Sequence, residues 1–177
     1  MNKVFGTLAI ACWFATSAYG SEPEIDRAME NGRLLIEAVE AGRDVSLKSF
    51  ENRAQIKQYL SKHKCPGLKY RNYVIDTSDG SYLYVVASKG RNAIVGRHFK
   101  APIDNGRVDV EAFESSTKSC INLGSAKGNV AAFTVTHLQP YPNEFHVLVE
   151  KVAGRPLYVA TEKGLFNVKD GQITTVE

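Results

Sequence analysis

The chain has 177 residues, of which 44% are hydrophobic and 23% are charged, close to the average of globular domains. This length and composition favour one folded domain with its own core and exclude a disordered chain. The formal charge of +3 is too small to indicate nucleic acid as a partner.

Residues 1–20 carry the features of a secretory signal peptide. Lys3 supplies a positive start, Val4–Phe14 is an uncharged apolar run, and Ala18-Tyr19-Gly20 puts small residues before the cleavage position. The apolar run is shorter than the roughly 20 residues that a membrane-spanning helix needs. We therefore predict a cleaved signal and one mature domain, residues 21–177, that is periplasmic or secreted and has no transmembrane segment.

Cleavage removes Cys12 and leaves an even pair of cysteines, Cys65 and Cys120. In an oxidising compartment such a pair predicts one disulfide. The bond would close a loop of about 55 residues and stabilise the folded chain by about 4 kcal/mol. Two free buried thiols are the alternative, and no Cys-x-x-Cys motif points to thiol redox chemistry.

Two helices are expected in the N-terminal part of the mature domain, residues 21–64. The capping pattern Ser21-Glu22-Pro23-Glu24 predicts a helix start, and apolar residues at helical spacing continue to about Ala41. A second helix is expected over residues 49–63, where Cys65-Pro66-Gly67 ends it. The predicted disulfide would thus join the end of this helix to the later part of the chain.

Strands are expected throughout residues 69–177, where runs rich in β-branched and aromatic residues alternate with turns that contain glycine or aspartate. The expected strands are Tyr70–Ile75, Tyr82–Ala87, Ala93–Phe99, Arg107–Phe113, Val130–Leu138, Phe145–Val152, Leu157–Ala160, Leu165–Val168 and Ile173–Val176. No segment between them shows helical periodicity, so antiparallel neighbours are expected. The predicted fold is α+β, with two N-terminal helices followed by a meandering antiparallel sheet of about eight or nine strands.

The segment Leu157–Val176 resembles one blade edge of a β-propeller repeat, with turn glycines at regular positions. A propeller needs several copies of such a segment, and this chain holds one. We therefore interpret the segment as two consecutive tight hairpins.

Two histidines form the best-defined candidate site. With Pro140–Asn143 as a four-residue hairpin loop, symmetric register places His137 opposite His146, with Cβ atoms about 5 Å apart. Two imidazoles at this distance are suited to a metal ion, or to mutual repulsion when protonated near pH 6. A metal ion would need a further ligand, for which Glu144 and Glu150 are the nearest carboxylates. The alternative is two histidines on the rim of a hairpin.

Two further features suit a macromolecular partner. The stretch 57–71 is basic and contains tyrosines, which fits an acidic protein surface, a cell-wall polymer or anionic lipid. A stiff loop at 140–142 presents an aromatic residue that could enter a cleft of a partner. The candidate contacts are Lys62, Lys64, Lys69, Arg71, Pro140, Tyr141 and Pro142. A solvated helix face and an ordinary loop are the alternatives.

No catalytic motif, zinc motif, phosphate loop or dinucleotide fingerprint is present in the sequence, and no cofactor is expected. We therefore predict a non-enzymatic exported binding protein, similar in role to an inhibitor or an immunity protein. It would act through a rigid sheet and protruding loops on a protein or cell-envelope partner. The alternatives are a small hydrolase or metal-dependent enzyme that uses His137 and His146, and a carrier with an apolar pocket between helices and sheet. The partner, the oligomeric state and the strand order stay open.

Overall fold

The structure, a computed structural model, describes residues 22–125 and 129–177 of the chain. The predicted signal peptide, residues 1–20, and Ser21 lie outside the described residues. The described part is α+β with one disulfide, as the sequence predicts, but it has a third α-helix and its strands are divided among three sheets. No helix in these two ranges is long and apolar enough to cross a membrane.

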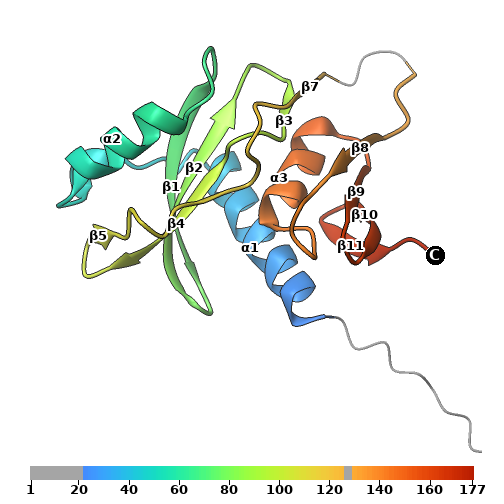
Figure 1. Cartoon of the computed structure of the whole chain (residues 1–177), viewed down its shortest axis with the longest axis horizontal. Coiled ribbons are helices and arrows are strands. Elements are labelled where there is room, and N and C mark those ends of the chain that lie inside the picture. The colour runs from blue at the N-terminus through green and yellow to red at the C-terminus, as the bar shows by residue number, and fades with distance from the viewer. Residues whose placement is uncertain (1–21, 126–128) are drawn as a thin grey trace, which may run out of the picture.

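Four layers lie side by side in the molecule (Figure 1). The helices are α1 (Pro23–Glu40), α2 (Arg53–His63) and α3 (Glu144–Ala153), with a 3-10 turn η1 (Leu47–Ser49) before α2. Helix α2 covers the outer face of the first sheet, and α1 and α3 lie between the first and the second sheet. The helix pair α1 and α3 is therefore packed against a sheet on each side.

The first sheet has the strand order β1-β2-β4-β5, with β6 beside β4, and its pairings are antiparallel. The strands are β1 (Lys69–Thr77), β2 (Gly80–Ser88), β4 (Phe99–Asp104), β5 (Arg107–Val108) and β6 (Glu114–Ser115). In β2, Leu83 and Val85 face α2, whereas Tyr84 and Val86 face α1 and α3. Both faces of this sheet are covered, which explains the nearly continuous apolar run in β2.

The second sheet has the strand order β11-β10-β9-β8. Its strands are β8 (Phe133–Thr136), β9 (Leu157–Thr161), β10 (Gly164–Lys169) and β11 (Gln172–Thr175). Strands β9, β10 and β11 form the two predicted hairpins, whereas β8 pairs with β9 in parallel. A short antiparallel pair, β3 (Ala93–Ile94) and β7 (Asn122–Gly124), brings the described strands to eleven instead of the expected eight or nine.

The prediction of a strand at Phe145–Val152 is wrong, because this segment belongs to α3, the crossover between the parallel strands β8 and β9. The expectation of antiparallel neighbours throughout 69–177 fails at the same place. The seven residues Glu144–Glu150 are all buried, since α3 lies between two sheets. The polar residues Glu144, His146 and Glu150 are buried together with the apolar ones, and the alternating Phe145, Val147 and Val149 match the period of a strand.

Local signals nevertheless mark both ends of α3. The side chain of Asn143, the N-cap, accepts the backbone N–H of Phe145, and Gly154 ends the helix in the left-handed region with φ of 59°. The side chain of His146 accepts the backbone N–H of Asn143 in return. This Asn-to-Gly spacing is the signal by which the helix could have been found.

The disulfide between Cys65 and Cys120 confirms the prediction, with Cα atoms 5.7 Å apart. It joins the end of α2 to the loop before β7. Arg97 holds the same two segments together: its guanidinium donates to the carbonyl of His63 at 2.6 Å and to the carbonyl of Lys118 at 2.9 and 3.2 Å. The end of α2 is therefore fixed to the loop before β7 by a covalent bond and by a charged side chain.

Candidate functional site

His137 and His146 meet in the structure, although not as cross-strand partners. His137 follows β8 and donates its backbone N–H to Ala160 of β9 at 2.8 Å, while His146 lies in the first turn of α3. The two ring centroids are 4.6 Å apart in an edge-to-face arrangement. The predicted hairpin over Pro140–Asn143 is wrong, and the proximity arises because α3 starts beside the end of β8.

Both rings are buried, which disfavours their charged forms. Burial lowers the pKa of His137, and it lowers the pKa of His146 to about 3, with the neighbouring His137 as a further cause. The Nδ1 atom of His146 is used in the cap of α3, and Nε2 of His137 has no hydrogen-bond partner among the described residues. Across 22–125 and 129–177, no three histidine, cysteine or carboxylate side chains gather into a group that could hold a metal ion.

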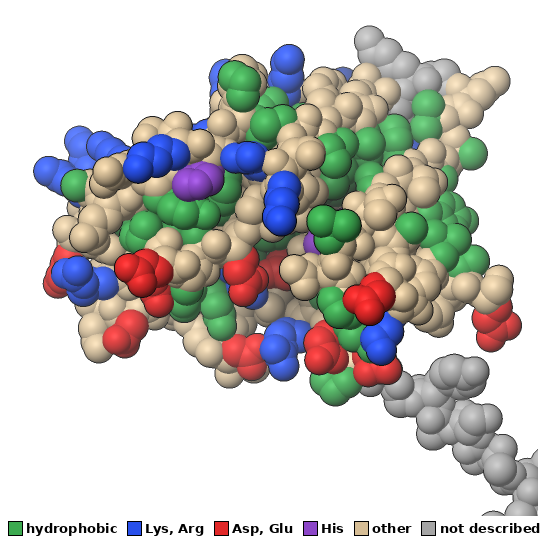
Figure 2. Space-filling view, in the orientation of Figure 1, with side chains coloured by type: hydrophobic (Ala, Val, Ile, Leu, Met, Phe, Trp, Pro, Cys, Tyr) green, Lys and Arg blue, Asp and Glu red, His purple; other side chains and the backbone are tan. Residues whose placement is uncertain are grey.

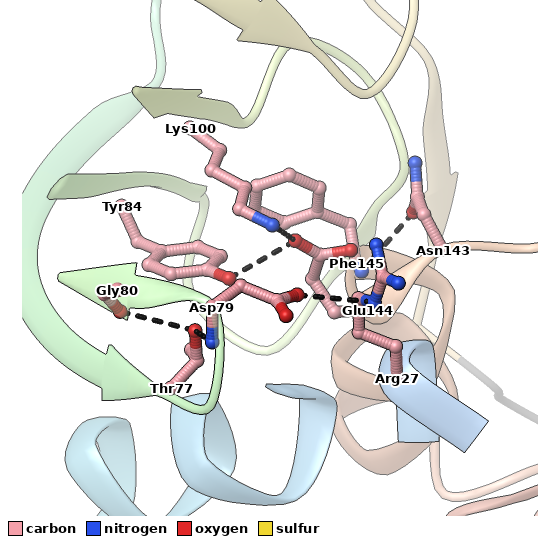
Figure 3. A network of polar contacts seen from close by, with 9 residues as sticks. All are labelled: Arg27, Thr77, Asp79, Gly80, Tyr84, Lys100, Asn143, Glu144 and Phe145. Carbon is pink, nitrogen blue, oxygen red and sulfur yellow. Dashed lines mark hydrogen bonds and ion pairs between the residues drawn. The ribbon is translucent and has the colours of Figure 1, made fainter. Parts of the chain in front are cut away.

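Glu144 joins α3 to the first sheet rather than to the histidines. Its Oε1 atom accepts a hydrogen bond from the hydroxyl of Tyr84 at 3.0 Å and lies 2.9 Å from Nζ of Lys100 (Figure 3). The side chains of Lys100 and Glu144 are only 16% and 9% exposed, and Lys100 also lies 4.4 Å from the ring centroid of Tyr82. Burial, followed by the charge of Glu144, raises the pKa of Tyr84 far above its usual value, so the hydroxyl stays a donor.

A second ion pair lies nearby and connects the other helix of the middle layer. Arg27 of α1 approaches Asp79, in the turn between β1 and β2, with Nε and Oδ2 3.0 Å apart (Figure 3). The backbone N–H of Asp79 donates to Oγ1 of Thr77, which orders this turn. The polar groups at this place therefore hold α1 and α3 on the first sheet, and each has a structural partner.

The 140–142 loop does not have the geometry of a protruding wedge. Tyr141 is half-buried and packs edge-to-face on Phe166 of β10, with ring centroids 6.0 Å apart, and Pro142 is buried. Pro140 is half-buried as well. The aromatic body of Tyr141 is thus used inside the fold, and a role of these three residues in binding stays a prediction.

The four basic candidates are distributed over different parts of the surface. Lys62 is exposed on α2, and Nζ of Lys64 lies 4.8 Å from the ring centroid of Tyr70. Lys69 and Arg71 are exposed in β1, and Arg71 lines a pocket on the opposite face of the first sheet from α2. These residues therefore do not form one basic patch.

A groove of about 680 Å³ runs between α2 and the segment 104–111. The ring of Tyr59 lies between the rings of His63 and Phe113, with centroid distances of 4.2 and 4.6 Å. The rim carries charges of both signs: Lys62, Asp104, Arg107, Asp109 and Glu111. Because both faces of Tyr59 are already covered, the groove offers no open aromatic platform, and its rim favours neither sign of ligand charge.

The outer face of the second sheet is a surface that sequence reasoning missed. Side chains alternate along each strand, and one set faces the core with α1 and α3. The other set faces outward and includes eight uncharged residues, with Lys169 and Gln172 beyond them at the paired ends of β10 and β11. The eight are Thr134, Thr136, Tyr158, Ala160, Leu165, Asn167, Thr174 and Val176. We call these eight residues the sheet face. None of the described helices covers it, and Figure 2 shows mainly hydrophobic and uncharged side chains over this end of the molecule.

Two large apolar side chains of the sheet face are open to solvent. Leu165 is 37% exposed and Val176 is 39% exposed. Val176 directly follows β11 and lies beside Leu165 of β10, because its backbone N–H donates to the carbonyl of Leu165 at 2.8 Å. Neighbouring exposed apolar side chains suit an interaction site better than scattered ones do.

We compared the chain with protein-family models, with curated proteins and with solved structures. No match was found in any of the three comparisons. The function is therefore inferred from the residues and geometry of this chain alone.

Proposed function

We propose that this chain is an exported, non-enzymatic binding protein, similar in role to an inhibitor or an immunity protein, and that the sheet face is its contact surface for a protein partner. The observation that carries the proposal is the low charge of the outward side of the second sheet, where Lys169 at the end of β10 is the one charged residue among the outward positions of the described strands, in a chain that is 23% charged. A solvated sheet face normally alternates polar and charged residues outward, whereas the centre of a protein interface is depleted in charge and enriched in aromatic residues.

The sheet face is also held rigidly. Its strands are paired over β8–β11, and the inward side chains Leu157, Val159, Phe166 and Val168 are almost fully buried. A surface that keeps its backbone geometry loses little conformational freedom when a partner binds. The sheet face therefore supports binding without rearrangement.

Export is part of the same proposal. The predicted signal peptide directs the chain to the periplasm or out of the cell, and the Cys65–Cys120 bond supports such a location because disulfides persist in oxidising compartments. The alternative of a hydrolase that uses His137 and His146 has no geometric support. Both rings are buried, and His146 is engaged in a helix cap.

The proposal is tested by placing a charge in the sheet face. The mature protein, Leu165→Glu and a matched control, Val74→Glu, are used to capture partners from the periplasmic fraction, with quantification by mass spectrometry. Val74 is a suitable control because it is an exposed strand valine of the first sheet, 38% exposed against 37% for Leu165. We expect one partner to be captured by the unmodified protein and by Val74→Glu, and to be reduced about tenfold or more with Leu165→Glu. Equal capture by all three proteins, or no macromolecular partner at all, would contradict the proposal.

A further inference from the structure

A pocket of about 270 Å³ lies between the helix pair α1 and α3 and the end of the β1–β2 hairpin. Most of its wall is apolar, with Val39 from α1, Val86 from β2, and Leu148 and Val152 from α3. Val152 lies in the last turn of α3, after the buried residues Glu144–Glu150, and is 45% exposed. The volume is near the lower end of the range of small-molecule sites, and the apolar wall is typical of them.

One polar group stands out at this pocket. Arg71, exposed on β1, lines it beside the buried Tyr73, and burial raises the pKa of the Tyr73 hydroxyl although a hydrogen bond from Arg71 opposes the increase. His98 also lines the pocket, but both of its ring nitrogens already have backbone partners. Its Nδ1 atom accepts the backbone N–H of Ala87 at 3.1 Å, and Nε2 lies 2.6 Å from the carbonyl of Ile94. Arg71 is therefore the charged donor of the pocket wall, and because a guanidinium carries five N–H donors, its hydrogen bond to Tyr73 leaves others for a ligand.

The charges around the pocket are mainly positive. Its wall includes Ser88, Gly90 and Asn92 from the turn after β2, and the same turn carries the exposed Lys89 and Arg91. Neither of these two side chains forms an ion pair with a carboxylate of the described residues. The positive charges around the pocket favour an anion over a neutral or cationic ligand.

Two carboxylates lie near the pocket and must be counted. Glu40, next to Val39, is paired with Lys151, with Oε1 and Nζ 3.3 Å apart. Asp44 lies close enough to Tyr73 for its charge to act on the hydroxyl. Asp44 therefore opposes the binding of an anion beside Arg71, and its removal should strengthen that binding.

We propose that this pocket binds a small organic monocarboxylate, with its apolar body against Val86, Leu148 and Val152 and its carboxylate on the guanidinium of Arg71. A guanidinium presents two parallel donors that match the two oxygens of a carboxylate. The apolar wall accepts a short alkyl or aromatic body by burial. This inference is independent of the proposed partner, because the pocket lies on the first sheet and the sheet face lies on the second.

The test is a titration of the mature, oxidised protein with octanoate and with its neutral analogue octanamide, followed by calorimetry and by methyl NMR shifts of Val86, Leu148 and Val152. We expect saturable binding of octanoate, weakened about tenfold or more by Arg71→Gln and strengthened by Asp44→Asn. Octanamide should bind the unmodified protein more weakly than octanoate, and Arg71→Gln should remove this difference.

Lys69→Gln is the matched control, because Lys69 is an exposed cation of the same strand that does not line the pocket. It should leave octanoate binding unchanged, and so should Leu165→Glu on the sheet face. Absence of saturable octanoate binding, an equal loss with Lys69→Gln, or equal affinity for octanoate and octanamide would overturn the proposal. Near-UV circular dichroism of Arg71→Gln is the folding control, and we expect an unchanged spectrum because Arg71 is exposed.

Discussion

The packing of α1 against α3 can be tested by adding a single methyl group. Gly32 of α1 is buried against Val147 of α3, and a Cβ atom built at Gly32 would lie 2.7 Å from Cβ of Val147 and 2.9 and 3.0 Å from its two Cγ atoms. These contacts are closer than van der Waals contact allows. Helix α3 cannot move away from α1 freely, because it is also packed against both sheets.

We expect Gly32→Ala to destabilise the protein even though alanine favours a helix. Replacing a helical glycine by alanine contributes about 1 kcal/mol of stability through helix propensity. Overpacking a closed core costs about 3 kcal/mol at the upper end of its usual range. The net loss is therefore about 2 kcal/mol, or a decrease of roughly 4–8 °C in Tm for a domain of this size.

The assay is urea unfolding of the mature, oxidised protein, followed by circular dichroism. Val147→Ala removes the two Cγ atoms from the contact, so the double variant Gly32→Ala/Val147→Ala should be more stable than the sum of the single effects by about 1 kcal/mol. A Gly32→Ala protein as stable as the unmodified one, or strictly additive effects in the double variant, would refute the close contact between the two helices.

Three further outcomes are expected from unfolding measurements on the same mature protein. Burial lowers the pKa of His98 to about 4 and that of His146 to about 3, so the folded state binds fewer protons than the unfolded state below pH 6.5. The stability that each neutral buried histidine contributes is fully present above pH 6.5 and is lost as the pH falls. The free energy of unfolding measured in urea titrations should therefore decrease by about 2 kcal/mol per histidine between pH 7 and pH 5. A free energy that does not change with pH would contradict the burial of both rings. Lys100→Met should lower the free energy of unfolding by about 3 kcal/mol, because it leaves the buried Glu144 carboxylate without its cation. Adding Glu144→Gln should recover part of this loss. An unchanged free energy of unfolding in Lys100→Met would show that the pair is solvated. The double variant Cys65→Ser/Cys120→Ser should lose about 4 kcal/mol, and an unchanged urea midpoint would contradict a bond that closes this loop in the folded chain.

Elements with one buried face or a clear turn could be predicted from the sequence. Helix α2 is amphipathic, with Ile56 and Leu60 buried, and it ends near the cysteine that forms the disulfide. The hairpins of β9, β10 and β11 have glycine-containing turns and alternate side chains between the core and the solvent. In each case the local pattern and the tertiary environment agree.

The sequence predicts a strand in place of helix α3 because Phe145, Val147 and Val149 alternate along the chain. Its polar residues Glu144, His146 and Glu150 are buried as well, so polarity does not mark an exposed helix face. One missed helix also changed the interpretation of the histidines. His137 and His146 are neighbours, but the neighbourhood is produced by a parallel crossover and a helix cap instead of a hairpin. The expected strand Ala93–Phe99 is likewise divided between β3 and the start of β4.

The candidate sites depend on which segments lie together in space, which a local pattern does not contain. The alternation that forms the sheet face is visible in each strand, yet only the parallel pairing of β8 beside β9 and the position of the helices show that one side stays uncovered. The monocarboxylate pocket combines Arg71 of β1 with Val39 and Val152 of the two middle helices. These residues are far apart in the chain and meet only through the four-layer packing.

The central claim, a protein partner on the sheet face, is tested most directly by photo-crosslinking in the exporting cell. A photoreactive residue is placed at position 165 in β10 and, in a second strain, at position 74 in β1, two sites of nearly equal exposure. We predict one adduct of defined mass from position 165 and none from position 74. No adduct from position 165, or the same adducts from both positions, would contradict the claim.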